Sequence, residues 1–182
     1  MLFRYDLDFL SPQHKDLLDA DNGPGLRWLG GVPDRLVFIL AKMNTLFEDH
    51  GHCLDSEIVQ DLERDIEACK PVISSGAGED PALAIGRVVV QQSWRLAGYV
   101  YLYMGLCGAN SLDKRVVKVQ KQFMRLLETV KPSRNPDSFL VFPMIIVLLL
   151  LHCRTNPSCL LVYGVFLSAT SQGQWEMIRS EY

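Results

Sequence analysis

The stretch PALAIGRVVVQQSWRLAGYVYLYMGLC, from Pro81 to Cys107, decides the fold. Asp80 is suited to cap a helix and Pro81 to open one, and no proline interrupts the residues that follow. Apolar side chains lie on several sides of this helix, so we expect it to be central; they are Val89, Trp94, Leu96, Ala97, Tyr101 and Met104. Tyr99 to Tyr103 resembles a β-strand, but the uninterrupted run favours helix.

Amphipathic patterns on both sides of this stretch predict further helices. We expect them at residues 12–20, from Pro33 to about Asp49, from Asp55 or Ser56 to Cys69, from Ser111 to Val130, and from Pro136 to Leu151. Ser111 is the expected cap of its helix, with Leu112 facing inward. Short polar loops join these segments. The predicted fold class is therefore all-α, a helical array or bundle of about five to six helices.

Composition narrows the function classes. The 182 residues are 48% hydrophobic and 21% charged, which suits one globular domain with a sizeable core. The formal net charge is −3, whereas a DNA-binding domain usually carries a basic surface that neutralises phosphates. We therefore expect no direct contact between this chain and nucleic acid.

The cysteines and the apolar segments indicate an intracellular, soluble protein. Five scattered cysteines form no C-x-x-C pair, as is usual for reduced proteins: Cys53, Cys69, Cys107, Cys153 and Cys159. Met1 to Asp6 shows no signal peptide. Phe139 to Leu151 is almost wholly apolar, but it is shorter than a membrane span and contains Pro143. A buried core helix is the preferred interpretation, and no membrane association is expected.

Candidate chemical sites are weak. His50, His52 and Cys53 lie close together, but no second ligand pair stands at a zinc-site spacing. His152, Cys153 and Cys159 form a weaker case of the same kind. No nucleophile elbow and no phosphate-binding loop is present. We therefore assign no catalytic, cofactor-binding, metal-binding or DNA-binding residue.

Charge is separated between two of the predicted helices. Glu57, Asp61, Glu63, Asp65 and Glu67 lie on one, and Lys114, Arg115, Lys118, Lys121 and Arg125 lie on the other. Both sets are most simply solvated helix faces. The basic set also fits an acidic partner or the acidic helix of the same domain. A helix that reads a DNA groove fits less well, because the opposite side of this predicted helix is expected to be buried in the core through Phe123, Leu126 and Leu127.

Three segments carry a resemblance to a known family. They are NGPGLRWLGGVPDRLVFILAKMNTL from Asn22 to Leu46, RLAGYVYLYMGLCG from Arg95 to Gly108, and VVKVQKQFMRLLETV from Val116 to Val130, followed by Phe142-Pro143. In this order and spacing, residues 22–147 resemble the fungal-specific transcription factor domain, the central regulatory region of zinc binuclear cluster transcription factors. The resemblance implies an all-helical fold, a nuclear location and regulation of RNA polymerase II transcription, without catalysis.

The resemblance has two limits. Family members usually carry a six-cysteine zinc cluster that binds DNA, and this chain has five cysteines and no comparable run. After the Phe-Pro pair and a short aliphatic run, family members usually continue with a turn and another amphipathic helix, a pattern that Leu148 to Tyr182 lacks. We therefore divide the chain into a helical domain at 1–147 and a divergent, irregular tail at 148–182. One back-translation of Asn156 to Met177 in another frame resembles the missing family helix. A frameshift or mis-set exon boundary near Leu148 is therefore one hypothesis for the tail.

The leading interpretation is a regulatory domain that binds other proteins and is not an enzyme. Expected partners are the transcription machinery or a paralogous regulator, and a homo- or heterodimer is compatible with it. One alternative is a truncated or frameshifted, nonfunctional helical remnant. A second is a small helical enzyme with an unrecognised site, which would require polar residues to converge in a pocket: Asn44, Gln91, Gln92 and Arg95.

Overall fold

The computed structural model describes residues 31–72, 81–129 and 137–153, and these residues form five α-helices and one π-helical turn without a β-strand. The helices are α3 (Asp34–His50), α4 (Ser56–Ala68), α5 (Pro81–Val100), α6 (Lys114–Glu128) and α7 (Asp137–Cys153), with the π-helix η2 (Tyr101–Leu106) continuing α5. The predicted all-α class is confirmed. The expected helix at 12–20 lies outside the described residues.

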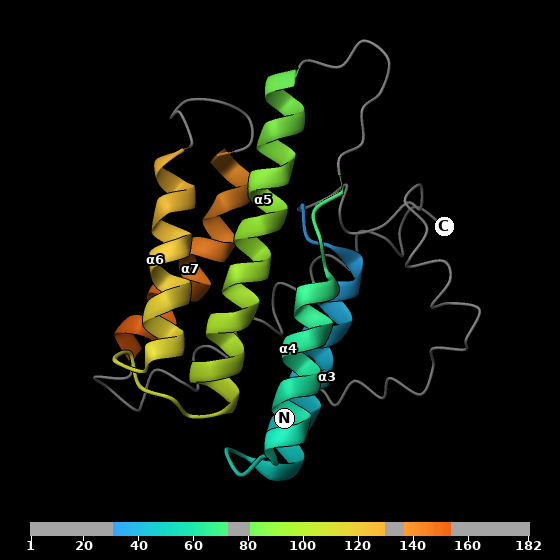
Figure 1. Ribbon diagram of the computed structural model, residues 1–182, viewed down its shortest axis with the longest axis vertical. Helices are drawn as coiled ribbons and strands as arrows, with labels where there is room; N and C mark the ends of the chain where they lie inside the picture. The colour runs from blue at the N-terminus through green and yellow to red at the C-terminus, as the bar shows by residue number, and fades with distance from the viewer. Residues whose placement is uncertain (1–30, 73–80, 130–136, 154–182) are drawn as a thin grey trace, which may run out of the picture.

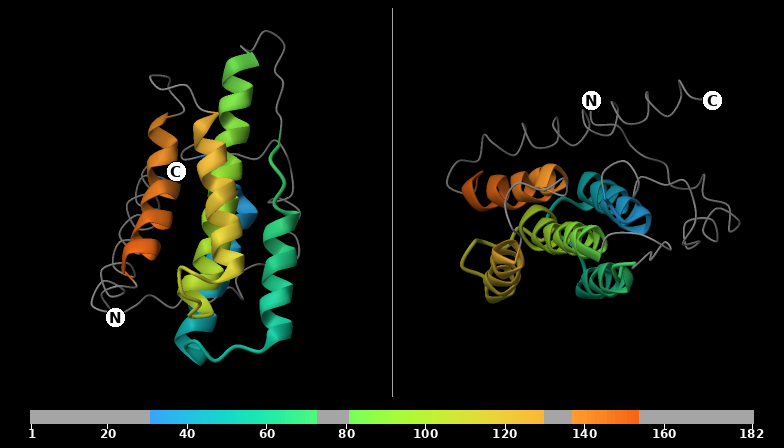
Figure 2. Two further views of the ribbon diagram at one scale, coloured as in Figure 1. Left: turned by 60° about the vertical axis from the view of Figure 1, so that its left-hand side comes forward. Right: turned by 90° about the horizontal axis from the view of Figure 1, so that it is seen from above.

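α5 occupies the centre of the bundle, as its apolar pattern predicted. It packs against each of the other four α-helices. Seen from above, α4 and α6 lie on one side of α5, and α3 and α7 lie on the other (Figures 1 and 2). The strand interpretation of Tyr99 to Tyr103 is excluded, because α5 ends in helix and η2 begins directly after Val100.

The surrounding helices bury residues at three- and four-residue spacing, which places them on one side of each helix. The buried residues are Leu36, Ile39 and Met43 of α3, Leu62 and Ile66 of α4, and Val116, Val119 and Phe123 of α6. Gly51 ends α3 with φ at 59°, and its N–H donates to the carbonyl of Phe47 at 2.8 Å. Glycine is favoured there because this left-handed conformation strains other residues.

The start of α6 differs from the prediction. Asp113, not Ser111, is the N-cap, and its Oδ1 accepts the backbone N–H of Arg115 at 2.8 Å. Leu112 was expected to face inward, but 83% of it is exposed. Both errors have one cause: the chain turns at residues 111–113 before the helix begins, so Leu112 is outside the helical periodicity.

α7 continues through Pro143, which is buried within it. Leu140, Ile146, Val147 and Leu150 join the core, which confirms that this segment packs as a helix of the bundle. The opposite side is exposed at Val141 and Leu148 among others. Among the residues that the structure describes, no helix combines the length and the apolar character that crossing a membrane requires.

Candidate interaction surface

Three tyrosines at the junction of α5 and η2 contact the surrounding helices. Tyr99 and Tyr103 are four residues apart, and their rings stack with centroids 6.1 Å apart. Tyr101 lies between them in sequence and points elsewhere, since side chains two positions apart on a helix leave it in different directions. Its hydroxyl donates to Asn44 Oδ1 of α3.

The stacked pair links α5 to both α4 and α6. Tyr99 donates its hydroxyl hydrogen to the Glu63 carbonyl of α4 at 3.3 Å. From the other side, the guanidinium carbon of Arg115 lies 4.8 Å from the centroid of the Tyr103 ring, which is a cation–π contact. Tyr99 and Tyr103 therefore occupy the space between the acidic helix α4 and the basic helix α6.

Burial and nearby charge suppress ionisation in this cluster. Burial, followed by the hydrogen bond to Glu63 and its charge, raises the pKa of the Tyr103 phenol. Burial is also the main cause that raises the pKa of Tyr99 and of the Cys107 thiol. A raised pKa makes a thiol a poorer nucleophile at neutral pH, because less of it is thiolate. These groups are therefore suited to packing and hydrogen bonding.

Arg115 and Asp113 form an ion pair at the start of α6. Arg115 donates to Asp113 through Nη2 at 3.1 Å and through Nε at 3.3 Å. These hydrogen bonds lower the pKa of Asp113 and raise that of Arg115. The pair holds the guanidinium near Tyr103, so the loop before α6 fixes the contact between α6 and η2.

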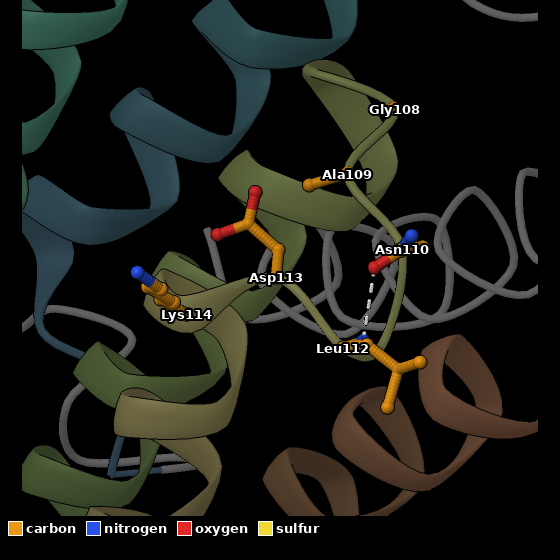
Figure 3. Close-up of a pocket in the computed structure, with 6 residues that line it drawn as sticks. All are labelled: Gly108, Ala109, Asn110, Leu112, Asp113 and Lys114. Atoms are coloured by element: carbon orange, nitrogen blue, oxygen red, sulfur yellow. Dashed lines mark hydrogen bonds between the residues drawn. The ribbon is translucent and has the colours of Figure 1, made fainter.

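The same loop borders an open hollow of about 700 Å³. It is lined by Gly108, Ala109, Asn110, Leu112, Asp113 and Lys114 (Figure 3). Asn110 Oδ1 accepts the Leu112 N–H at 3.0 Å, and the side chains of Leu112 and Asp113 leave the loop in different directions. The lining offers one paired carboxylate, one amine and one amide, which suits surface contacts better than a reaction.

The outer side of α6 carries a second hollow, of about 360 Å³. Its lining mixes polar and apolar side chains of α6 alone: Val117, Gln120, Lys121, Met124, Arg125 and Glu128. Met124 is 51% exposed here. Lys114 and Lys118 are also exposed, and their spacing to Lys121 and Arg125 keeps all four on one side of the helix.

Two acidic residues of α4 form ion pairs. Asp65 of α4 accepts contacts from Arg35 at 3.9 Å and Lys42 at 3.6 Å, both from α3. Asp61 pairs with Arg64 within α4. Within the described ranges, no ion pair joins α4 to Lys114, Lys118, Lys121 or Arg125. The alternative in which this basic face meets α4 of the same molecule is therefore not supported by an ion pair at these four residues.

The polar residues proposed for an enzyme site do not converge. Gln91 bonds to Val72, and Asn44 bonds to Tyr101. Arg95 Nε is buried without a hydrogen-bond partner in the described part of the chain. Neither of the two hollows is lined by any of these residues or by Gln92.

The histidine–cysteine group after α3 takes part in packing. His52 Nδ1 lies 3.1 Å from the Leu106 carbonyl oxygen, and its ring meets Phe47 edge-on with centroids 5.2 Å apart. No group of three or more metal-ligating side chains occurs among the residues described. The side chains of His152 and Cys153, and all of Cys159, lie outside them.

Sequence reasoning did not identify the tyrosine cluster. The spacing of Tyr99 and Tyr103 was a usable signal, since residues four apart on a helix are neighbours. The position of the Arg115 side chain could not be predicted from the sequence, because it depends on the conformation of the loop that precedes α6.

Comparison with known proteins gives one result. The sequence pattern of the fungal specific transcription factor domain family matches residues 2–154, a range that includes every helix described above. It begins before Asn22 and ends beyond Val147, the limits on which the resemblance rested. No curated protein and no solved structure matches the chain.

Proposed function

The chain belongs to the family of fungal specific transcription factor domains, and from this premise we propose that it regulates RNA polymerase II transcription in the nucleus through contacts with other proteins. The observation that carries the proposal is the match over residues 2–154. Membership of this family supports a regulatory, non-catalytic role. The partners that fit are the transcription machinery or a related regulator.

Charge and burial support protein contacts over DNA contacts. The chain has a net charge of −3, and five of its 18 Lys and Arg residues lie on α6. The other side of α6 is buried through Val116, Val119 and Phe123, so the helix cannot leave the bundle to enter a DNA groove without exposing core residues. The proposal therefore assigns DNA recognition to a separate module.

The proposal is tested by tethering the whole 182-residue chain to an unrelated DNA-binding domain in a fungal host. Reporter transcription is compared with that produced by the DNA-binding domain alone. We expect output to rise or fall, because a regulatory domain brings its partners to the promoter. An unchanged output, with the fusion expressed and bound at the promoter, would refute the proposal.

A matched control separates folding from function. Leu36→Asp places a carboxylate at a fully buried position of α3 and is expected to unfold the bundle. This variant should lose the reporter effect. If it behaves like the natural chain, the effect does not come from the folded domain, and the nonfunctional-remnant alternative is favoured.

A further inference from the structure

The outer side of α6 carries a row of basic side chains, which we call the basic stripe: Lys114, Lys118, Lys121 and Arg125. α6 stands at the edge of the bundle and packs against α5 and η2 through its opposite side, where Val116 and Phe123 are buried (Figure 2). All members of the stripe are exposed. Their spacing of four, three and four residues extends the stripe along the helix axis over about 16 Å.

No acidic side chain in the described part of the chain pairs with the basic stripe. Within the described ranges, the ion pair of α6 joins Arg115 to Asp113, outside the stripe. Like charges three or four residues apart on a helix repel each other and lower its stability. The free domain therefore carries a repulsion on α6 that no ion pair among the described residues offsets.

An apolar surface lies beside the basic stripe, on the flank of α6 turned away from Arg115. Val117 and Met124 are seven residues apart, which places them on the same flank, and Met124 is 51% exposed. Both line the hollow of about 360 Å³ on this helix. Lys121 and Arg125 line it as well. An apolar side chain seated in the hollow would therefore lie next to two cations of the stripe.

We propose that this face of α6 binds an acidic segment of another protein, with its carboxylates against the basic stripe and one aliphatic side chain in the hollow. Carboxylates form charge-assisted hydrogen bonds with Lys and Arg, and their charge relieves the repulsion within α6. Met124 suits the hollow, because an unbranched, flexible side chain adapts to different apolar partners. The inference rests on the proposed regulatory role and specifies the chemistry of its protein partner.

A nucleic acid satisfies only part of this face. Phosphates would pair with the basic stripe, but a phosphate backbone brings no aliphatic side chain to Val117 and Met124. Glu128 also lines the hollow and would repel a phosphate placed there. An acidic protein segment with an aliphatic side chain complements both the stripe and the hollow.

The test uses the whole 182-residue chain and a fluorescein-labelled helical peptide with one carboxylate for each member of the stripe and one leucine beside them. Fluorescence anisotropy measures binding. Two matched peptides carry amides in place of the carboxylates, or asparagine in place of the leucine. We expect the acidic peptide to bind more weakly as salt rises, and each matched peptide to bind roughly tenfold more weakly or less. No binding of the acidic peptide, or equal binding of all three, overturns the proposal.

Variants of the chain separate binding from folding. Lys118→Gln/Lys121→Gln should weaken peptide binding by roughly tenfold or more, while the unfolding midpoint in urea stays the same or rises, because like charges are removed. Arg64→Gln/Lys70→Gln removes the same charge from exposed positions on and just after α4, and should leave binding unchanged. A lower midpoint in the α6 variant, or equal weakening of binding in both variants, overturns the proposal.

Met124→Ser tests the hollow and separates a peptide from DNA. This variant should bind the acidic peptide several-fold more weakly and should bind the peptide without leucine as the natural chain does. A labelled DNA duplex that binds more tightly than the peptide, and equally to the natural chain and to Met124→Ser, would make α6 a phosphate-binding surface and overturn the proposal.

The tethered reporter distinguishes this inference from the regulatory role on which it rests. Lys118→Gln/Lys121→Gln should reduce the effect of the natural chain on transcription. If the natural chain changes reporter output and this variant does so equally, the inference about α6 fails while the regulatory role stands. If the natural chain binds the peptide but leaves output unchanged, the regulatory role fails while the contact at α6 stands.

Discussion

Gln91 of α5 bonds to Val72 through both the oxygen and the nitrogen of its side-chain amide. The Val72 N–H donates to Gln91 Oε1 at 3.0 Å, and Gln91 Nε2 donates to the Val72 carbonyl at 3.2 Å. Gln91 is only 4% exposed, so these bonds are shielded from water on its side. The side chain thus replaces a backbone partner for the segment that leaves α4, and fixes that segment against the central helix.

Gln91→Leu should lower the free energy of unfolding by about 1–3 kcal/mol, because both polar groups of Val72 lose their partner. Urea denaturation followed by circular dichroism measures the change. Gln92→Leu is the control, since Gln92 is half-buried next to Gln91, and it should cost less than about 0.5 kcal/mol. Equal losses in the two variants would show that the pairing with Val72 is unimportant.

Stability should fall at alkaline pH through Tyr101. Burial raises the pKa of its phenol from 10.0 to about 12, so the native state holds the proton after the unfolded chain has lost it. The stabilisation is complete below pH 10 and is lost as pH rises towards 12. Its size is roughly 2–3 kcal/mol.

The test is denaturant unfolding at a series of pH values from neutral to strongly alkaline. Tyr101→Phe removes the ionisable group and should make the alkaline decline shallower, at a cost of about 1 kcal/mol at neutral pH from the lost bond to Asn44. Burial also raises the pKa of Tyr99 and Tyr103, so some decline should persist. An identical slope in the variant would contradict the role of Tyr101.

Leucine truncation should distinguish the core from the loop before α6. Leu36→Ala removes a fully buried side chain and should cost about 2–5 kcal/mol in unfolding free energy. Leu112→Ala, at a position that is 83% exposed, should change it by less than about 0.5 kcal/mol. Thermal or urea unfolding measures both. A large loss of unfolding free energy in Leu112→Ala would contradict the exposed position and support the inward orientation that was expected from the sequence.

Two glycines with positive φ angles should respond differently to alanine. Gly31 has φ at 66° and Gly51 at 59°, so both substitutions place alanine in a conformation that L side chains rarely adopt. A Cβ at Gly31 would also collide with Val90 of α5, whereas nothing lies within 4 Å of one at Gly51. We expect Gly31→Ala to lower the unfolding midpoint in urea more than Gly51→Ala, and equal shifts would contradict the close approach.

Much of the fold could be predicted because long, uninterrupted apolar patterns fix helices reliably. The stretch from Pro81 to Cys107 was expected to be one central helix, and α5 with η2 confirms it. The start of α6 could not be chosen correctly because Ser111 and Asp113 are both good caps. Arg115 decides which residue is the cap, because it donates both its backbone N–H and its guanidinium N–H groups to Asp113.

The candidate surface was predictable only in part. The charges of α4 and α6 were visible in the sequence, but their position on one side of α5 depends on how the other four α-helices pack around it. The use of Asp65 by Arg35 and Lys42 likewise depends on α3 lying beside α4. Local periodicity contains no information about such neighbours.

The π-helical turn has a consequence for how the chain could change during evolution. In η2 the Cys107 N–H reaches back five residues, to the Leu102 carbonyl at 2.9 Å. A π-turn accommodates one residue more than an α-turn, so deletion of a single residue within Tyr101–Leu106 would leave an ordinary α-helix. Because the extra residue is absorbed within the turn, the segment after it would keep about the same direction around the axis of α5. One codon lost from this turn would therefore remove the π-turn while leaving α6 and its basic side in place.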